Sequence, residues 1–352
     1  MRIRLGILDD NTRYTSLLAT YFNRHYSEQL EIHIYNSLDS FEQNSHQKRI
    51  DVLLANPDIL QGTSSIPSNV GVAYLSESTD IESIRDVRAV CKYQKAELIY
   101  KEIISIYSEI ETGEVYRMGG LNSRVLLFRG VSGGVGATTT AVSCAASIAG
   151  TGRTVLYLNL EENGVVSHLL RGEGSATLSD VLYVVKSRHS NIALKLDSMV
   201  RKDFSGVCFF APFSVMLDSC NLHKEDVKSL MDAIRISGNY DYIVIDVSPH
   251  TNDFLDYLNS LAEYIFLVSD GSEVSGIKLQ KLIEAMAIED ERDDSTVLRR
   301  TSLIYNRFGS WAREVVCNPQ VDVFARINRY EGASALTIRD QIAGSGLFDS
   351  FN

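Results

Sequence analysis

Residues 129–140 read Arg129-Gly130-Val131-Ser132-Gly133-Gly134-Val135-Gly136-Ala137-Thr138-Thr139-Thr140, and this glycine-rich stretch decides the fold of the second part of the chain. An apolar run at 125–128 predicts a strand before it, and small residues from 138 to 149 predict a helix after it. A strand, a glycine-rich turn and a helix in this order form a phosphate-binding loop, because backbone N–H groups and the helix N-terminus surround phosphate oxygens. The stretch therefore predicts a P-loop nucleotide site.

The loop departs from the usual P-loop pattern at its lysine. That pattern ends in Gly-Lys-Ser/Thr, whereas this chain has Gly136-Ala137-Thr138. The backbone cradle is retained, but the amine that reaches the β- and γ-phosphates is missing. We therefore expect a protein that binds a nucleotide and hydrolyses it poorly.

The composition is that of a globular protein without the electrostatic footprint of a nucleic-acid binder. The chain has 34 Lys and Arg against 45 Asp and Glu, a net charge of −11, and acidic residues exceed basic ones on both sides of residue 123. Non-specific nucleic-acid binding needs the opposite balance. The 5 cysteines show no C-x-x-C spacing, which is typical of reduced thiols in the cytoplasm. No apolar run approaches the ~18 residues that would span a bilayer, so we expect no transmembrane segment.

The first part of the chain alternates short apolar runs with helical periods. Strands are predicted at 3–8, 30–35, 51–55, 70–75 and 86–90, and a closing helix at 96–110. This alternation predicts an α/β domain with a parallel sheet. We expect a first domain at 1–112, a polar, glycine-containing linker at 113–123, and a second domain at 124–352.

The second domain is predicted to be a doubly wound, mostly parallel α/β sheet with a P-loop NTPase fold. Besides the strand before the loop, strands are predicted at 154–160, 207–210, 242–246, 264–268 and 302–305. Asp246 ends the third of these, and ligands of such sheets bind where the strands end. In a P-loop fold, an acid at that place holds Mg²⁺ through water, while the loop hydroxyl of Thr138 binds the ion directly.

Four motifs of the second domain together resemble the MinD/ParA family of ATPases, whose Walker A loop is deviant. They are Gly133-Gly134-Val135-Gly136-x-Thr138-Thr139, the segment from Thr151 to Glu161, the strand that ends at Asp246, and Ile304-Tyr305-Asn306-Arg307. The family has two loop lysines, one that reaches the partner's nucleotide across a dimer and one that grips phosphate in cis. This chain has Ser132 and Ala137 at those positions.

The resemblance implies ATP and Mg²⁺ as cofactors. It assigns cofactor binding to Gly133, Gly134, Val135, Gly136, Ala137, Thr138, Thr139 and, against adenine, Asn306, and metal binding to Thr138 and Asp246. The family's Asp-x-Asp switch corresponds to Asn159-Leu160-Glu161, in which Glu161 can still orient water, whereas Asn159 is no carboxylate. Because both lysines that stabilise the transition state are lost, the chain is expected to be at most a weak ATPase.

The first domain resembles a response-regulator receiver, which has a flavodoxin-like sheet. The strand ends match the receiver site at the acidic pair Asp9 and Asp10, the hydroxyl of Ser76 and Lys92. The phosphoacceptor position holds Asn56, and an amide cannot form an acyl phosphate. Asp58 lies two residues beyond that position. We therefore expect a degenerate receiver that takes no phosphate and offers a fixed surface to other proteins.

A degenerate receiver before a lysine-poor MinD-like domain resembles the TadZ/CpaE family of pilus-assembly localisation proteins, over nearly the whole chain. The resemblance implies a homodimer held by ATP and a receiver that contacts pilus or secretion assembly proteins, including the secretion ATPase. It also implies a cytoplasmic protein recruited to the cell pole or the inner membrane face. The alternative is a MinD-, FlhG- or ParA-like positioning ATPase that cycles on membrane or DNA. The acidic balance, the missing lysines and the lack of a basic amphipathic C-terminal segment argue against cycling.

Overall fold

The structure is a computed structural model of the chain. The residues that it describes are 2–45, 49–60, 70–81, 83–109, 123–187, 192–237, 239–249, 253–293, 296–310, 312–314 and 319–351. The chain divides into two compact units, residues 1–116 with 188–198 and residues 117–187 with 199–352. The expected linker at 113–123 lies outside the described residues except for Ser123. The expected domain boundaries therefore stay a prediction.

The first unit contains a six-stranded sheet with the order β2-β1-β3-β4-β6-β5. Its strands are β1 (Ile3–Leu8), β2 (Leu30–Tyr35), β3 (Val52–Ala55), β4 (Gly71–Ser76), β5 (Ser83–Ile84) and β6 (Val87–Cys91). All neighbours are parallel except β5 and β6, which form a hairpin. Without β5, this is the strand order of a flavodoxin-like receiver. Each predicted strand is present to within one residue, and the expected fold is confirmed.

Capping residues and the spacing of apolar residues explain the helices of the first unit. They are α1 (Thr12–His25), α2 (Leu38–Ser45) and α3 (Ala96–Glu109), and α6 (Ile192–Met199) is grouped with this unit up to Ser198. Asn11 caps α1, because its side chain accepts a hydrogen bond from the backbone N–H of Tyr14. Leu18 and Phe22, four residues apart on α1, are both buried. The apolar face of the helix thus packs against the sheet.

The second unit contains an eight-stranded sheet with the order β14-β13-β12-β7-β11-β8-β10-β9. Its strands are β7 (Arg124–Gly130), β8 (Val155–Asn159), β9 (Arg201–Lys202), β10 (Cys208–Phe209), β11 (Tyr242–Val247), β12 (Tyr264–Ser269), β13 (Thr301–Phe308) and β14 (Asp322–Asn328). All neighbours are parallel except β9 and β10. The predicted strands are present, and β9 and β14 are added at the two edges of the sheet.

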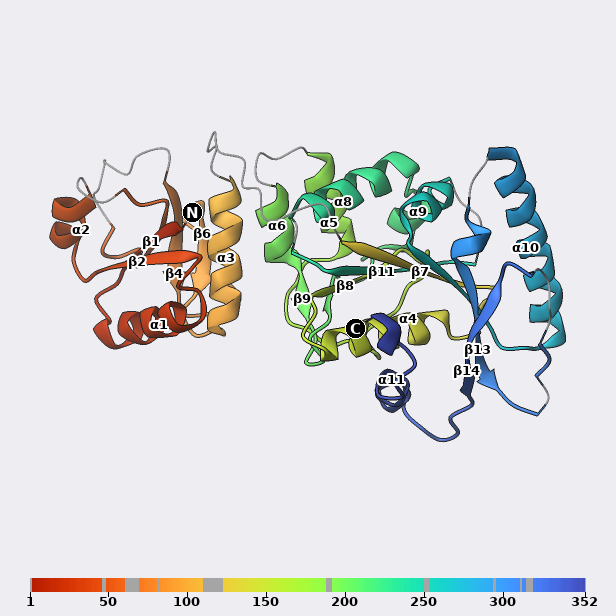
Figure 1. Ribbon diagram of the computed structural model, residues 1–352. Helices are drawn as coiled ribbons and strands as arrows, with labels where there is room; N and C mark the ends of the chain where they lie inside the picture. Colours follow the sequence, from red (N-terminus) through yellow and green to blue (C-terminus); the bar gives the residue numbers. More distant parts are fainter. Residues whose placement is uncertain are drawn as a thin grey trace. The chain divides into compact units, whose positions relative to one another are not determined.

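Helices cover both faces of this sheet. They are α4 (Ala137–Gly150), α5 (Leu178–Lys186), α7 (Met216–Cys220), α8 (Lys224–Ser237), α9 (Leu255–Leu261), α10 (Glu273–Asp293) and α11 (Ala335–Ala343), with the short turns η1 (Leu298–Arg300) and η2 (Asp349–Phe351). Figure 1 shows α4 and α11 on one face and α5, α8 and α9 on the other. This arrangement is the expected doubly wound fold.

Helix α4, which follows the glycine-rich loop, is packed tightly inside the second unit. Its residues are mostly small, and Ala141, Cys144 and Ala145 are fully buried against the sheet. Helix α11 packs against α4 from the other side. Close packing of small side chains resists displacement, so the loop that precedes α4 is held at the carboxyl edge of the sheet.

Arg339 anchors α11 through a buried ion pair. Its side chain is fully buried, with Nη1 3.2 Å from Oδ2 of Asp203. The same nitrogen donates to the carbonyl of Leu169 at 2.6 Å. The guanidinium carbon also lies 4.9 Å from the centre of the Phe204 ring. One arginine therefore connects α11 to the segment after β8 and to the β9–β10 hairpin.

Replacing Arg339 with alanine should lower the free energy of unfolding by about 3 kcal/mol, because Asp203 would stay buried without its cation. Denaturant unfolding followed by circular dichroism measures this loss. The matched control is Arg326→Ala, since Arg326 pairs with Glu314 at the surface and should matter little. Equal losses in the two variants would contradict the anchoring role of Arg339.

Candidate functional site

The glycine-rich loop, residues 131–136, joins β7 to α4 at the carboxyl edge of the sheet. Gly134 and Gly136 have φ angles of 79° and 90°, in the left-handed region that favours glycine. A Cβ atom at Gly133 or Gly134 would meet no described atom within 4 Å, so the loop borders open space there. Gly136 is the N-cap of α4 and has no side chain to bind the first N–H groups of the helix. The loop therefore offers backbone donors to an anion.

Two consecutive residues of β13 hold this loop. The side-chain amide of Asn306 donates to the carbonyl of Val135 at 2.8 Å. The guanidinium of Arg307 donates to the carbonyl of Gly134 at 2.8 Å. Asn306 comes so close that a Cβ atom at Gly136 would lie 2.2 Å from its amide nitrogen. The amide nitrogen of Asn306 is thus bound to the loop, and the contact with adenine expected for this residue stays a prediction.

Thr138, Glu161 and Asp246 meet beside the loop from three different elements. The hydroxyl of Thr138 donates to Oε2 of Glu161 at 3.3 Å. Asp246 is fully buried on β11, and its Oδ2 accepts a hydrogen bond from the hydroxyl of Tyr157 at 2.8 Å. Among the described residues, none donates a hydrogen bond to its other oxygen, Oδ1. A buried carboxylate oxygen without a donor is costly and suits a cation.

The two carboxyl groups disfavour each other's charge. Burial, and then the charge of Glu161, raise the pKa of Asp246 from 3.8 to about 8. Burial also raises the pKa of Glu161. Both effects are those of negative groups in a site of low dielectric. The donor set is a hydroxyl and two carboxylates, which fits Mg²⁺, because that ion takes oxygen ligands and keeps several waters.

Asn159 positions the switch and does not face Thr138. Its Oδ1 accepts a hydrogen bond from the backbone N–H of Glu161 at 2.9 Å. Its Nδ2 donates to the hydroxyl of Tyr157 at 3.2 Å. Asn159 therefore connects the start of the switch to the Tyr157–Asp246 pair, and it leaves Glu161 as the switch carboxylate next to the loop.

Ser132 and Ala137 occupy the two positions at which the MinD/ParA family has lysines. Ala137 is buried at the first position of α4, and Ser132 is partly exposed. Arg129, just before the loop, donates from Nη2 to the carbonyl of Pro249 at 2.9 Å. Burial lowers the pKa of Arg129. Its guanidinium is thus held at the segment after β11.

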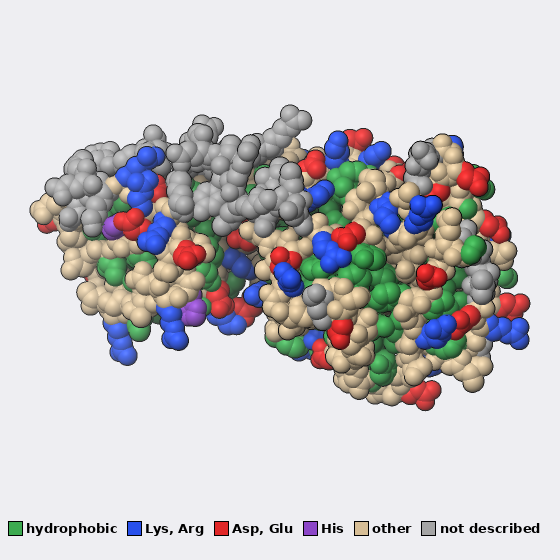
Figure 2. All heavy atoms as spheres, in the orientation of Figure 1, with side chains coloured by type: hydrophobic (Ala, Val, Ile, Leu, Met, Phe, Trp, Pro, Cys, Tyr) green, Lys and Arg blue, Asp and Glu red, His purple; other side chains and the backbone are tan. Residues whose placement is uncertain are grey.

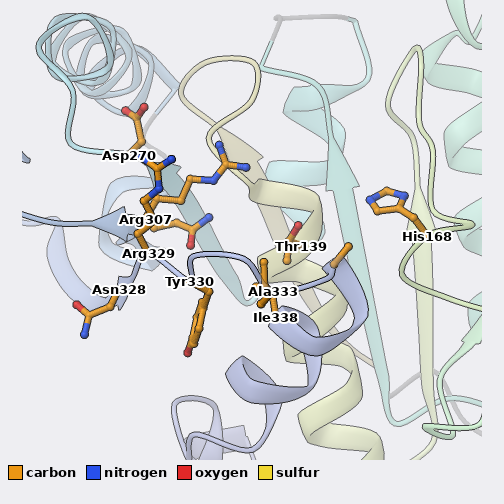
Figure 3. A pocket seen from close by; sticks show the side chains of 11 residues that line it. Thr139, His168, Asp270, Arg307, Asn328, Arg329, Tyr330, Ala333 and Ile338 are labelled. Atoms are coloured by element: carbon orange, nitrogen blue, oxygen red, sulfur yellow. The ribbon is translucent and has the colours of Figure 1, made fainter.

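A pocket of about 590 Å³ opens beside the loop. In Figure 3, Asp270, Arg307 and Tyr330 border it on one side and Thr139 and His168 on the other. These residues come from the start of α4, from β13, and from the segments that follow β8, β12 and β14. The volume lies in the range of small-molecule sites, and the lining is more polar than that of most such sites.

The strand ends of the first unit bring the expected receiver residues together. Nζ of Lys92 lies 2.5 Å from Oδ2 of Asp9, and both side chains are buried. The amide of Asn56 donates to Oδ1 of Asp10 at 3.4 Å. The hydroxyl of Ser76, at the end of β4, donates to a nearby backbone carbonyl. The lysine charge is therefore already balanced by Asp9, and the residue at the phosphoacceptor position is an amide.

The structure also places residues at the site that the sequence did not single out. Tyr157 supports Asp246 from β8, yet it reads as an ordinary apolar strand residue and carried no signal. Asp270 follows β12 and Asn328 ends β14, and both border the pocket. The rule that ligands bind at strand ends would have indicated Asn328 if the edge strand β14 had been predicted.

Comparison with protein families divides the chain in the same way. Residues 1–108 match the family described as "TadZ-like, receiver domain". Residues 123–295 match the family described as "AAA domain". The glycine-rich loop and the Thr138, Glu161 and Asp246 cluster all lie in the second match.

Parts of this chain are similar to known proteins. The chromosome partitioning protein ParA of Caulobacter vibrioides is 30% identical over 152 residues, which are 41% of this chain and 55% of that protein. The chain thus spans about half the length of the curated relatives it matches. A ParA family ATPase from Chlorobium tepidum TLS has a TM-score of 0.52 at 18% identity, over 66% of this chain and 97% of that chain. MinD in the MinC:MinD complex of Aquifex aeolicus has a TM-score of 0.49 at 18% identity, over 65% and 94%.

Replacing Asp246 with asparagine should stabilise the ligand-free protein by about 1–3 kcal/mol at pH 8. A raised pKa means that ionising Asp246 costs folding free energy, so wild-type stability should fall as the pH rises from 3.8 to about 8. The variant lacks this penalty, and its advantage should shrink at pH 5. Denaturant unfolding with chelator measures both values. Asp322→Asn, which changes an exposed carboxylate, is the control; an equal gain there would contradict the argument.

Acetyl phosphate with Mg²⁺ should leave the first unit unmodified, because Asn56 offers no carboxylate. Intact-mass measurement detects the modification. The variant Asn56→Asp should gain it, since Asp9, Asp10 and Lys92 are in place. Fast labelling of the wild type that is lost in Asp58→Asn would show that the phosphoacceptor was assigned to the wrong residue.

Proposed function

We propose that this chain, which has a TadZ/CpaE-type architecture of a TadZ-like receiver domain followed by a ParA/MinD-like P-loop domain, is an ATP-binding assembly hub. In this proposal ATP with Mg²⁺ stabilises a homodimer, hydrolysis is slow, and the receiver domain holds components of a tight-adherence pilus or secretion system. The observation that carries the proposal is an open phosphate loop beside a pocket, with a buried Asp246 oxygen that lacks a donor.

The geometry supports a nucleoside triphosphate as the ligand. The phosphates would lie on the loop at Gly133 and Gly134, next to the N-terminus of α4. Mg²⁺ would be held by the hydroxyl of Thr138, and by Asp246 through water, and its charge would relieve the repulsion between the two carboxylates. The base and ribose would occupy the pocket, which Thr139 borders from the first turn of α4.

Slow turnover follows from what the loop lacks. Ala137 and Ser132 supply no charge to the transferred phosphoryl group, where electrostatic stabilisation is the main catalytic effect. Glu161 stays beside Thr138 and can orient water. Binding depends on backbone donors and the metal, and it suffers less. The nucleotide then serves to hold a conformation or a dimer.

An exposed apolar surface next to the switch supports dimer formation. It consists of Val165 after β8 and Val215, Met216 and Leu217 around the start of α7, and each is more than half exposed. Ser219 of α7 donates a hydrogen bond to the carbonyl of Glu162, so this surface is tied directly to the switch. Clustered exposed apolar side chains mark interaction sites. We propose that a second copy of the chain covers them when nucleotide is bound.

The first domain would act through protein contacts and not through phosphate. Its site is balanced internally by the Lys92–Asp9 ion pair, so it needs no phosphorylation to hold one conformation. None of the described helices is long and apolar enough to cross a membrane. In this proposal the protein works in the cytoplasm, and pilus or secretion components, including the secretion ATPase, recruit it to the cell pole or the inner membrane face.

A DNA-bound positioning ATPase is the second candidate, because the Caulobacter relative is named a chromosome partitioning protein. The face drawn in Figure 2 shows Lys and Arg side chains interspersed with Asp and Glu over both units. Mixed charges of this kind do not produce the strong field that non-specific DNA binding uses. DNA binding by the purified protein at ~0.2 M salt would favour this second function.

Mg-ATP should bind to the purified protein in equilibrium dialysis and shift it from monomer to dimer in light scattering. Leu217→Asp should weaken the dimer about tenfold or more, because it places a charge in the apolar surface. Ile288→Asp is the matched control, since Leu217 and Ile288 are both 67% exposed and Ile288 lies on α10. Absence of nucleotide retention together with absence of a shift would refute the proposal.

A further inference from the structure

A triphosphate site without lysine needs another source of positive charge. The pocket beside the loop is lined by two arginines, Arg307 and Arg329. Arg307 is also hydrogen-bonded to the loop itself, through the carbonyl of Gly134. Arg129 is closer in sequence, but its Nη2 is bound to the carbonyl of Pro249. Arg307 is therefore the cation whose position both the pocket and the loop define.

We infer that Arg307 replaces part of the function of the missing lysines and makes the site select nucleotides by their number of phosphates. Its guanidinium holds the Gly134 carbonyl and places a full positive charge beside the loop. Charge-assisted contacts grow with the charge of the phosphate chain, so ATP should gain more from Arg307 than AMP does. This inference rests on the proposed nucleotide function and adds a specificity-determining residue to it.

The backbone conformation of Arg307 indicates that its surroundings hold this side chain next to the loop. Its φ angle is 56°, in the left-handed region, which costs a residue with a side chain about 1–2 kcal/mol. Such conformations persist where the surroundings impose them. The preceding residue, Asn306, is fixed by its hydrogen bond to Val135 and by its close approach to Gly136. The bound Asn306 thus turns the chain so that Arg307 reaches the loop.

Two substitutions separate the charge of Arg307 from its hydrogen bond. Arg307→Lys keeps the charge, whereas Arg307→Gln keeps a donor and loses the charge. Both retain the backbone strain, because both residues carry a Cβ atom. Arg307 is exposed, so both variants are expected to fold, and circular dichroism checks this. Arg326→Gln is the matched control, since Arg326 is an exposed arginine on the neighbouring strand and does not line the pocket.

Calorimetric titration with Mg-ATP, Mg-ADP, AMP and inorganic triphosphate tests the inference. Arg307→Gln should weaken ATP and triphosphate about tenfold and AMP by less than about twofold. Arg307→Lys should stay within about threefold of the wild type for all four ligands. The control should match the wild type.

Other results would overturn the inference. If Lys and Gln weaken ATP equally, or if ATP and AMP weaken by the same factor, Arg307 only shapes the loop. If the wild type binds ATP and Arg307→Gln binds it equally well, the inference fails and the proposed function stands. If the wild type binds neither ATP nor triphosphate, the proposed function fails first, and the role of Arg307 falls with it.

Discussion

The second unit is organised around a carboxylate in a place where a carboxylate is unfavourable. Asp246 is fully buried in the middle of the sheet, beside Glu161, and its Oδ1 has no donor among the described residues. A structural residue at this position would be apolar or fully hydrogen-bonded. The hydrogen bonds of Tyr157, Asn159 and Thr138 around it keep both acids in place without supplying a positive charge. The site therefore lowers the folding stability of the ligand-free protein, and a bound cation with phosphates would raise it again.

The two strand-end sites of this chain use their charges in opposite ways. In the first unit Lys92 and Asp9 form a buried ion pair and Asn56 is neutral, so the receiver site is balanced without a ligand. In the second unit the loop has no lysine, and the carboxyl groups of Asp246 and Glu161 lie together with raised pKa values. A balanced site holds one conformation, whereas an unbalanced site responds to what binds. This difference is the physical basis of the nucleotide control that we propose for the second unit and of the constant contacts that we propose for the first.

Much of the fold could be predicted from the sequence, because apolar runs at regular spacing are compatible with few secondary structures. The strands β1, β3, β7, β11 and β12 are buried on both sides and read as continuous apolar runs, and all were predicted. The edge strand β14 and the short β5 and β9 were not, because an edge strand carries polar residues and a two-residue strand has no period. Asp246, Glu161 and Thr138 could be proposed as site residues because each lies near the end of a strand or the start of a helix. The hydrogen bond from Asn306 to the loop could not be predicted, because it joins residues 171 positions apart.

The residues of this chain alone therefore predict two α/β domains, a phosphate loop without lysines and a receiver without its phosphoacceptor. These properties are local, because each depends on which residue follows which along a strand and a turn. The tertiary structure decides what the polar residues contact: that Asn306 and Arg307 bind the loop, that Asn159 positions the switch, and that Asp246 lacks a donor. Those contacts depend on strand order and on the depth of burial, which bring distant segments within hydrogen-bonding distance and which no local pattern records.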